Sequence, residues 1–373
     1  MHFGPGSVSQ IPGIIANICN SSSTIVLATD KNIVATGTPG RIVSSLRDAG
    51  YRVAMLDSIP AEPTDHDLDI LAGKVRIAKA SAIVAIGGGS VMDATKILSV
   101  LAIHSITTTE LAEQGVPGKG LPSLMVPTTA GTGAEATPNA IVLFPSKKLK
   151  IGVVSPYFIP EQVILAPELT IGLPSYLTAS TGIDALCHLL ECFLGKKANA
   201  FSDMYALEGL RLMMSALPAA FHNGSDLEAR SKAMLGAYYG GVCIAASGTN
   251  AVHALSYPLG GIYRIPHGVA NAVLLVPVMK YQKDLITARL AMVAEAMGCG
   301  RTGIDAVDAS AVVERLRSLV TELNIPTSLE RFGVGVSDLD MLTDAAYGVR
   351  RLLDNNPIEM DKNDIKAIYR EVI

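Results

Sequence analysis

The chain has 373 residues, of which 49% are hydrophobic and 17% are charged, and its formal net charge is −4. This length and apolar content suffice for two domains with their own cores. The scattered basic residues argue against a nucleic-acid-binding protein, and no uninterrupted apolar run approaches the roughly 20 residues of a membrane span. The first residues, MHFGPGSVSQIPG, lack a basic segment followed by an apolar one, so we expect a cytoplasmic protein.

Short apolar runs alternate with helical patterns in the first third of the chain. The runs are continuous and rich in β-branched residues, which is typical of strands buried on both faces. The predicted strands are residues 24–28, 52–56 and 82–86, and the predicted helices between them are about 39–49 and 67–80. This order predicts a parallel, Rossmann-like sheet. Further apolar segments at 124–126 and 140–144 extend that sheet or form a small hairpin.

A glycine-rich turn follows the predicted strand 82–86 directly. Its sequence is Gly87, Gly88, Gly89 and Ser90, and a helical pattern begins after it. Glycine lets the backbone approach a ligand, and a helix N-terminus favours an anion, so the turn is a candidate cradle for a pyrophosphate. The pattern is not GxGxxG, however, and by itself also suits a tight strand-to-helix turn.

A second cluster of glycines and hydroxyls, PTTAGTGAE, follows the apolar segment 124–126. Its three threonines, Thr128, Thr129 and Thr132, could hydrogen-bond a phosphate, a ribose or a nicotinamide amide. The cluster strengthens the dinucleotide interpretation of the first turn.

Asp30 closes the first predicted strand. A carboxylate at this place can accept hydrogen bonds from an adenosine ribose and would repel a 2′-phosphate, which favours NAD over NADP. An ordinary Asx turn explains an aspartate here equally well.

After about residue 160 the apolar residues recur at helical spacing and strand patterns become rare. The predicted helical stretches are 175–193, 200–221, 226–247, 268–297 and 308–323. We therefore predict an α/β dinucleotide-binding domain of residues 1–159 and an all-helical metal-binding domain of residues 160–373.

Four residues of the helical half have the chemistry of a metal site. Asp184 and His188 lie four apart, on one face of a predicted helix. His253 precedes an expected helix interruption at Pro258, and His267 follows a proline that suits the start of a helix. Three histidines and one aspartate would bind a divalent transition metal and leave a position for a substrate oxygen. Taken singly, each is also explained as a core histidine or a helix cap.

Four segments in this order resemble the iron-dependent (group III) alcohol dehydrogenases: IGGGSVMDATK, PTTAGTGAEAT, TGIDALCHLLE and HALSYPLGGIYRIPHGVANAVLLVPVM. The resemblance extends nearly from end to end of the chain. It implies that the metal ligands are Asp184, His188, His253 and His267. It implies that the cofactor contacts are Asp30, Gly87, Gly88, Gly89, Ser90, Asp93, Thr128, Thr129, Thr132 and Lys150.

Tyr257 departs from the commonest pattern of that family. Many members have a histidine at this position, close to the nicotinamide and often assigned to proton transfer. A similar H-x-x-x-Y-P arrangement occurs in a branch that includes the hydroxyacid–oxoacid transhydrogenases. We expect Tyr257 either to transfer a proton or to pack against the nicotinamide or substrate.

The resemblance implies metal-dependent hydride transfer between NAD(H), with NADP(H) less favoured, and a small alcohol and its aldehyde or ketone. Fe²⁺ is the expected metal and Zn²⁺ the alternative. It also implies a homodimer or higher homo-oligomer, with neither nucleic acid nor membrane as a partner. A transhydrogenase and a dehydroquinate synthase-like enzyme are the alternative functions, and the Asp-x-x-x-His pair argues against the latter. Arg264, Arg350 and Arg351 could attract an acidic substrate, although surface arginines are commoner.

Overall fold

The computed structural model describes residues 1–147 and 149–373. The chain forms two compact units. Unit 1 comprises Met1–Thr129 and Ala134–Thr170, and unit 2 comprises Ala130–Gly133 and Ile171–Ile373. The compact units divide after Thr170, and the predicted domain boundary after residue 159 stays a prediction.

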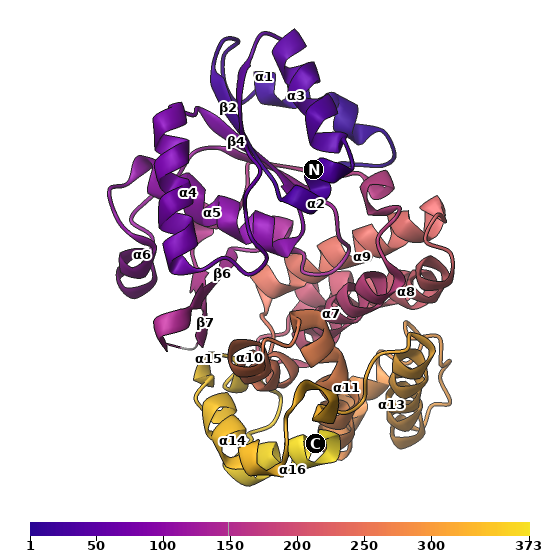
Figure 1. Cartoon of the computed structure of the whole chain (residues 1–373). Coiled ribbons are helices and arrows are strands. Elements are labelled where there is room, and N and C mark those ends of the chain that lie inside the picture. The colour runs from indigo at the N-terminus through magenta and orange to yellow at the C-terminus, as the bar shows by residue number, and fades with distance from the viewer. Residues whose placement is uncertain (148) are drawn as a thin grey trace. The chain divides into compact units, whose positions relative to one another are not determined.

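A six-stranded parallel sheet forms the centre of unit 1 (Figure 1). Its strand order is β1-β8-β5-β4-β2-β3. The strands are β1 (His2–Phe3), β2 (Thr24–Ala28), β3 (Arg52–Leu56), β4 (Ala82–Gly87), β5 (Ser123–Pro127) and β8 (Gln162–Leu165). The predicted parallel sheet is confirmed. Sequence analysis missed β1 and β8, because runs of two and four residues carry too little periodicity to be recognised.

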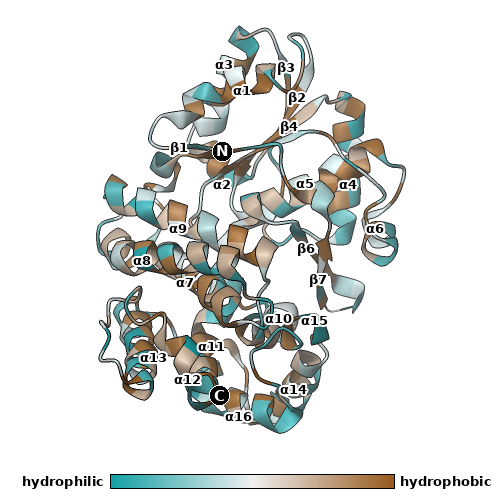
Figure 2. Cartoon of the chain, turned by 180° about the vertical axis from the view of Figure 1, so that it is seen from behind, coloured by the Kyte–Doolittle hydropathy of each residue, from teal (hydrophilic) through white to brown (hydrophobic). Residues whose placement is uncertain are grey.

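Successive residues of the central strands enter two different cores. Ile25 and Leu27 of β2 pack with α1 (Ile11–Ala16) and α3 (Thr38–Asp48), whereas Val26 and Ala28 pack with α4 (Asp65–Ala78) and α5 (Gly89–Ile103). Side chains alternate across a strand, so burial on both faces requires a continuous apolar run. The helices that flank the sheet carry both brown and teal residues in Figure 2, as expected for helices with one buried face.

Unit 1 also contains two short helices and a hairpin: α2 (Lys31–Ala35), α6 (Thr108–Gln114), and the antiparallel strands β6 (Asn139–Phe144) and β7 (Leu149–Val154). The segment 140–144 therefore forms a hairpin instead of extending the sheet. α4 begins at a capping box of Thr64 and Asp67. Such caps satisfy the first free N–H groups of a helix and fix where it starts.

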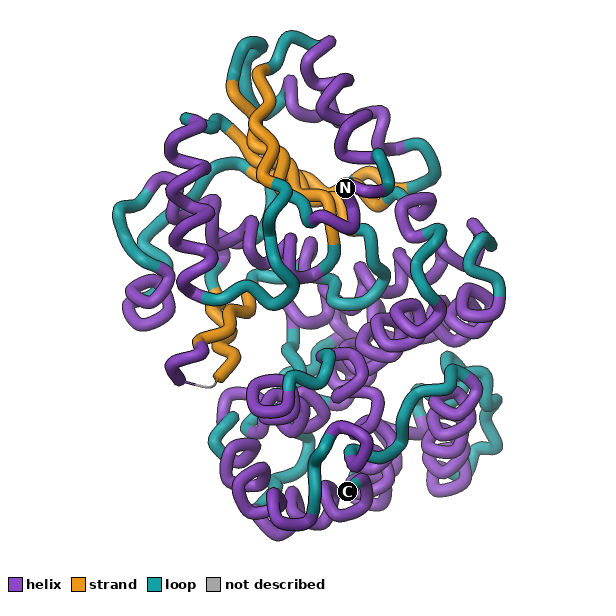
Figure 3. Tube along the Cα trace, viewed as in Figure 1, coloured by secondary structure: helices purple, strands orange, loops and turns teal. Residues whose placement is uncertain are grey.

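All described residues of unit 2 are free of strands, as Figure 3 shows by colour. Its helices are α7 (Ser175–Leu194), α8 (Ala200–His222), α9 (Leu227–Ala246), α10 (Ala251–Tyr263), α11 (His267–Gln282), α12 (Thr287–Ala291), α13 (Asp305–Glu322), α14 (Leu339–Tyr347), α15 (Arg350–Leu353) and α16 (Lys362–Val372). The predicted helical stretch 268–297 comprises two helices, because a 3-10 turn separates α11 from α12. Ile286 and Leu290, which follow this turn, are still buried. The helical spacing of apolar residues therefore continues across the turn, and the sequence does not show where α11 ends.

The helix interruption predicted at Pro258 is wrong. α10 continues through Pro258 to Tyr263, and Leu255 and Leu259 on either side of the proline are fully buried. A proline removes one backbone hydrogen bond. Tertiary packing on both sides of Pro258 holds the helix together despite that loss.

α7 is the central helix of unit 2 and contacts α8, α9 and α11. It is long and apolar enough to cross a membrane, but 89% of its most apolar window is buried inside the protein. A Cβ added to Gly182 would lie 2.2 Å from a side-chain atom of Leu217 on α8, so the absence of a side chain permits close helix packing. α7 has the burial of a core helix.

Candidate metal centre

Three helices of unit 2 supply the four predicted metal ligands. Asp184 and His188 lie one turn apart on α7, His253 lies on α10, and His267 is the first residue of α11. The side chains of the first three are 3–6% exposed, whereas that of His267 is 34% exposed. The cluster is therefore buried, and its open side is at His267.

The four side chains converge on one point. Oδ1 of Asp184 lies 3.6 Å from Nε2 of each of the three histidines. One ligand atom of every residue lies within 4.8 Å of the others. Ligands about 2.1 Å from a central ion at tetrahedral angles are about 3.4 Å apart, close to the three observed separations. Both the spacing and the donor chemistry fit a divalent transition metal.

Charge and burial act together on these groups. Burial alone would raise the pKa of Asp184, but the neighbouring imidazoles, His188 first, hold it well below its ordinary value. Burial lowers the pKa of His188. Burial also opposes protonation of His253, yet Glu191 and Asp184 together raise its pKa to about 9. Asp184 therefore stays ionised, as a metal ligand must, and a bound cation would displace the proton that Glu191 and Asp184 hold on His253.

Two further residues of the cluster were missed by sequence analysis. Nδ2 of Asn271 donates to Oδ1 of Asp184 at 2.7 Å and lies 3.2 Å from Nε2 of His253. Glu191 is fully buried and contacts Nδ1 of His253. Asn271 follows His267 by four residues, and Glu191 follows His188 by three, so helical spacing from the ligands would have found both.

Tyr257 follows His253 by one helical turn and is partly buried against the core of unit 2. Its ring centroid lies 6.2 Å from that of His267. The side chain is thus beside the open side of the cluster, where both proton transfer and packing against a ligand stay possible roles.

The glycine turn of unit 1 joins β4 to α5. Gly88 is the residue before α5, and no side chain caps this helix. A Cβ added to Gly87 would lie 2.5 Å from Cγ2 of Val91, so the turn tolerates no side chain there. Uncapped N–H groups at the start of a long helix are suited to bind an anion.

The predicted threonines divide between the two units. Thr128 is buried, and its N–H donates to the carbonyl of Gly87 at 2.9 Å. The Thr129 side chain would be 3.4 Å from a Cβ added to Gly88. These two threonines therefore lie beside the glycine turn, whereas Thr132 belongs to the segment 130–133 of unit 2.

Asp30 caps α2. Its Oδ1 accepts hydrogen bonds from the N–H groups of Asn32, at 2.8 Å, and Ile33, at 3.1 Å. The local structure is thus the Asx turn that by itself explains an aspartate at this position. Both bonds use Oδ1, and contact between Asp30 and a ribose stays a prediction.

Asp93 is engaged inside unit 1. Its Oδ2 accepts from the N–H of Ile141 on β6 at 3.1 Å, and its Oδ1 lies 3.8 Å from Nζ of Lys96. Burial raises the pKa of Asp93, and Lys96 opposes that shift. Contact with a cofactor stays a prediction for this residue.

Lys150 and Ser90 are linked by Glu62, which sequence analysis did not single out. Nζ of Lys150 lies 2.5 Å from Oε1 of Glu62, and the N–H of Glu62 donates to Oγ of Ser90 at 3.2 Å. Glu62 thus connects Lys150 and Ser90, which are two of the predicted cofactor residues.

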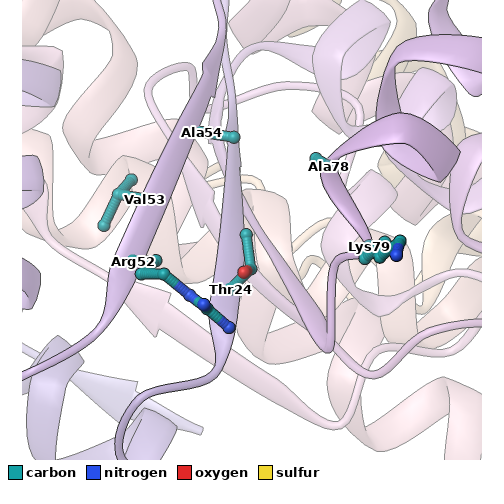
Figure 4. Close-up of a pocket in the computed structure, with 6 residues that line it drawn as sticks. All are labelled: Thr24, Arg52, Val53, Ala54, Ala78 and Lys79. Carbon is teal, nitrogen blue, oxygen red and sulfur yellow. The ribbon is translucent and has the colours of Figure 1, made fainter.

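A pocket of about 370 Å³ lies elsewhere on unit 1, lined by Thr24, Arg52, Val53, Ala54, Ala78 and Lys79 (Figure 4). Thr24 and Arg52 are the first residues of β2 and β3. Ligands of open parallel sheets bind at the carboxyl ends of the strands, where Asp30 and the glycine turn lie. This pocket is therefore a different place from the candidate dinucleotide site.

The comparisons with known proteins agree along the whole chain. Residues 1–167 match the family model "Iron-containing alcohol dehydrogenase", and residues 178–373 match "Fe-containing alcohol dehydrogenase family, C-terminal". Long-chain-alcohol dehydrogenase 1 of Geobacillus thermodenitrificans is 35% identical over 377 residues, covering 99% of this chain and 93% of that protein.

Solved structures give the same result. A 1,3-propanediol oxidoreductase superposes with a TM-score of 0.95 at 31% identity, covering 100% of this chain and 97% of that one. A sulfoacetaldehyde reductase from Bifidobacterium kashiwanohense, solved in complex with NAD⁺, superposes with a TM-score of 0.90 at 27% identity, covering 100% and 96%.

Proposed function

Since the chain belongs to the iron-containing alcohol dehydrogenase family, we propose that Asp184, His188, His253 and His267 hold its catalytic metal ion. The protein is an oxidoreductase that interconverts alcohols and aldehydes with a nicotinamide dinucleotide. The observation that carries the metal proposal is the equal separation of 3.6 Å between Oδ1 of Asp184 and the three imidazole nitrogens.

We propose Fe²⁺ as the ion, following the iron in the family's name, with Zn²⁺ as the alternative. Imidazole and carboxylate ligands suit both metals, so the donor set supports either. When bound, the ion supplies Lewis-acid catalysis at the substrate oxygen and the nicotinamide supplies or accepts the hydride.

The protein's own residues contribute position and proton handling. Burial of Asp184, His188 and His253 keeps water away from the inner side of the cluster. The partly exposed His267 marks the side from which a substrate enters. Tyr257, near His267, is proposed to exchange a proton with the substrate oxygen.

The dinucleotide is proposed to bind unit 1, with its pyrophosphate at the start of α5 and its adenosine ribose at Asp30. Thr128 and Thr129 lie beside the same turn. A carboxylate at Asp30 supports a preference for NAD(H), because it would repel the 2′-phosphate of NADP(H). Lys150, Asp93 and Thr132 are proposed as further contacts.

A hydroxyacid–oxoacid transhydrogenase is the second candidate, favoured by tyrosine instead of histidine at position 257. The three arginines give little reason to propose an acidic substrate. Arg264 and Arg351 are exposed, and Arg350 forms an ion pair with Asp354 at 2.5 Å. Small, uncharged alcohols and aldehydes are therefore the proposed substrates. A cytoplasmic homodimer or higher homo-oligomer is proposed as the working form.

The test is a substrate screen of the protein loaded with Fe²⁺ or Zn²⁺, using short alcohols, diols, hydroxyacids and aldehydes with NAD(H) and NADP(H). Net reduction of NAD⁺ by an alcohol is the expected result. Turnover of a hydroxyacid only when an oxoacid is added would establish the transhydrogenase instead. Full activity of a metal-free, chelated sample would contradict the metal proposal.

A further inference from the structure

Glu191 is a fully buried carboxylate that neither the ligand set nor the dinucleotide site includes. It lies on α7, seven residues after Asp184 and three after His188, so the three side chains share one face of the helix. A buried charge is costly unless it is hydrogen-bonded, and each oxygen of Glu191 has partners.

One oxygen of Glu191 caps α10. Oε1 accepts from the N–H groups of Asn250 at 3.1 Å, Val252 at 2.7 Å and His253 at 3.4 Å. These N–H groups lie at the start of α10, where no preceding helical turn supplies carbonyl acceptors for them. The three backbone N–H donors therefore hold Oε1 at the N-terminus of α10.

The other oxygen contacts the ring of His253. Oε2 lies within hydrogen-bond distance of Nδ1 of His253, and since a carboxylate only accepts, Nδ1 donates. In the neutral ring, Nε2 on the far side carries the lone pair, and it lies 3.6 Å from Oδ1 of Asp184. The His188 ring stacks on this imidazole, with centroids 4.7 Å apart, and further limits its rotation.

We propose that Glu191 is a positioning residue, which orients His253 and keeps the proton on Nδ1 so that Nε2 is free to bind the metal. α7 thus supplies two ligands and also holds the third. The inference rests on the proposed metal site. Carboxylates that orient metal-binding histidines in this way commonly change metal affinity about 10–100-fold when they are replaced.

Glu191→Gln separates positioning from helix capping. The three backbone N–H groups require an oxygen at the Oε1 position, so the glutamine oxygen takes that place and the cap persists. Its NH₂ group then faces Nδ1 of His253 and donates to it, which places the ring proton on Nε2, toward the metal. The variant therefore keeps the shape of the site and reverses the polarity of a single hydrogen bond.

The measurements are the dissociation constant for Zn²⁺, by competition with a chelator, the absorption spectrum of the Co²⁺-loaded protein, and the melting temperature of the metal-free protein. For E191Q we expect Zn²⁺ to bind about 10–100-fold more weakly and the Co²⁺ bands to shift. We expect the metal-free melting temperature to stay close to that of the wild type. E191D, which retains a carboxylate, should lose less affinity than E191Q.

Asp308→Asn is the matched control. Asp308 is also a buried carboxylate of unit 2, and it accepts from the N–H and Oγ1 of Thr302 at 2.8 and 2.7 Å. D308N should lower the melting temperature without changing Zn²⁺ affinity or the Co²⁺ spectrum.

Unchanged Zn²⁺ affinity in E191Q would overturn the inference, as would an equal loss of affinity in D308N. Absence of Zn²⁺ binding by the wild type would instead contradict the metal site itself. If E191Q does not fold, E191D decides: weaker Zn²⁺ binding relative to D308N supports positioning, and equal binding contradicts it.

Discussion

Each unit contains a buried cluster of charged groups, and the two clusters satisfy their hydrogen bonds differently. In unit 1, Nζ of Lys96 donates to both oxygens of Thr137, each at 3.0 Å, and to the carbonyl of Asn139 at 2.6 Å. In unit 2, three imidazole nitrogens converge on one carboxylate oxygen of Asp184, and the amide of Asn271 donates to that oxygen.

The difference indicates what each cluster does. An ammonium group has three N–H donors, and Nζ of Lys96 has an acceptor for each of them. These hydrogen bonds connect α5 to the segment that leads into β6, so the unit 1 cluster has a structural role. The cluster at Asp184 gathers three imidazole nitrogens around one carboxylate oxygen, and these are ligand types that a divalent transition metal binds. The role of a buried charged cluster is thus interpreted from the partners of its charged groups as well as from its composition.

Removing a ligand should give the largest effect. His267→Ala should lower kcat by more than about 100-fold, the upper end for changes outside the ligand shell. NADH binding, measured by fluorescence titration, should be unchanged, because the proposed nucleotide contacts lie mainly in unit 1. His222→Ala, at a histidine of unit 2 whose side chain is 60% exposed, is the control and should behave like the wild type.

The unit 1 cluster should affect stability and leave the metal site unchanged. Lys96→Met should lower the free energy of unfolding by about 3 kcal/mol, because Asp93 and Glu135 would lose their buried cation. Denaturant unfolding measures this loss, and Zn²⁺ affinity should be unaltered. Lys119→Met, where the side chain is 71% exposed, should change stability by less than about 0.5 kcal/mol. Equal effects of both variants would contradict a structural role for Lys96.

Tyr257→Phe tests whether the open side of the unit 2 cluster contains a proton donor. A loss of roughly 10²-fold in kcat, with an altered pH profile and normal cofactor affinity, is expected if the hydroxyl transfers a proton. Tyr263→Phe, on the same helix, is the control. A near-normal kcat in the Tyr257 variant would leave only a packing role.

Asp30 tests the charge at the proposed ribose site. Asp30→Asn keeps an oxygen for the cap of α2 and removes the charge, so kcat/KM for NADP(H) should rise roughly tenfold without loss of stability. Asp30→Gly should show a similar gain. Equal use of NAD(H) and NADP(H) by the wild type would mean that the role of Asp30 is wrongly assigned.

Glu135 should make the free energy of unfolding of unit 1 depend on pH. Burial raises the pKa of Glu135 to about 7 from an ordinary value of 4.5, although Lys96 opposes the shift. Because the folded state binds this proton more tightly, the stabilisation is complete below about pH 4.5 and is lost as the pH rises to about 7. The slope is at most about 1.4 kcal/mol per pH unit, and Glu135→Gln should remove it from denaturant unfolding curves.

Local patterns allowed much of the fold to be predicted. β2, β3 and β4 lie where continuous apolar runs stand, and α7, α8 and α9 lie where apolar residues recur every three to four positions. These patterns are informative because burial of a strand on two faces, or of a helix on one, constrains neighbouring residues directly. The family resemblance added the pairing of Asp184 and His188 with two histidines more than sixty residues later.

By itself, the sequence determined the two kinds of secondary structure, their order and the residue types that can hold a metal. Only the tertiary structure decided the hydrogen bonds between distant segments. Asp93 is directed at β6, Glu191 joins α7 to α10, and Asn271 contacts Asp184 across 87 positions of sequence. The continuation of α10 through Pro258 has the same origin, because packing partners that hold a helix, or satisfy a buried carboxylate, come from elements that no local spacing identifies.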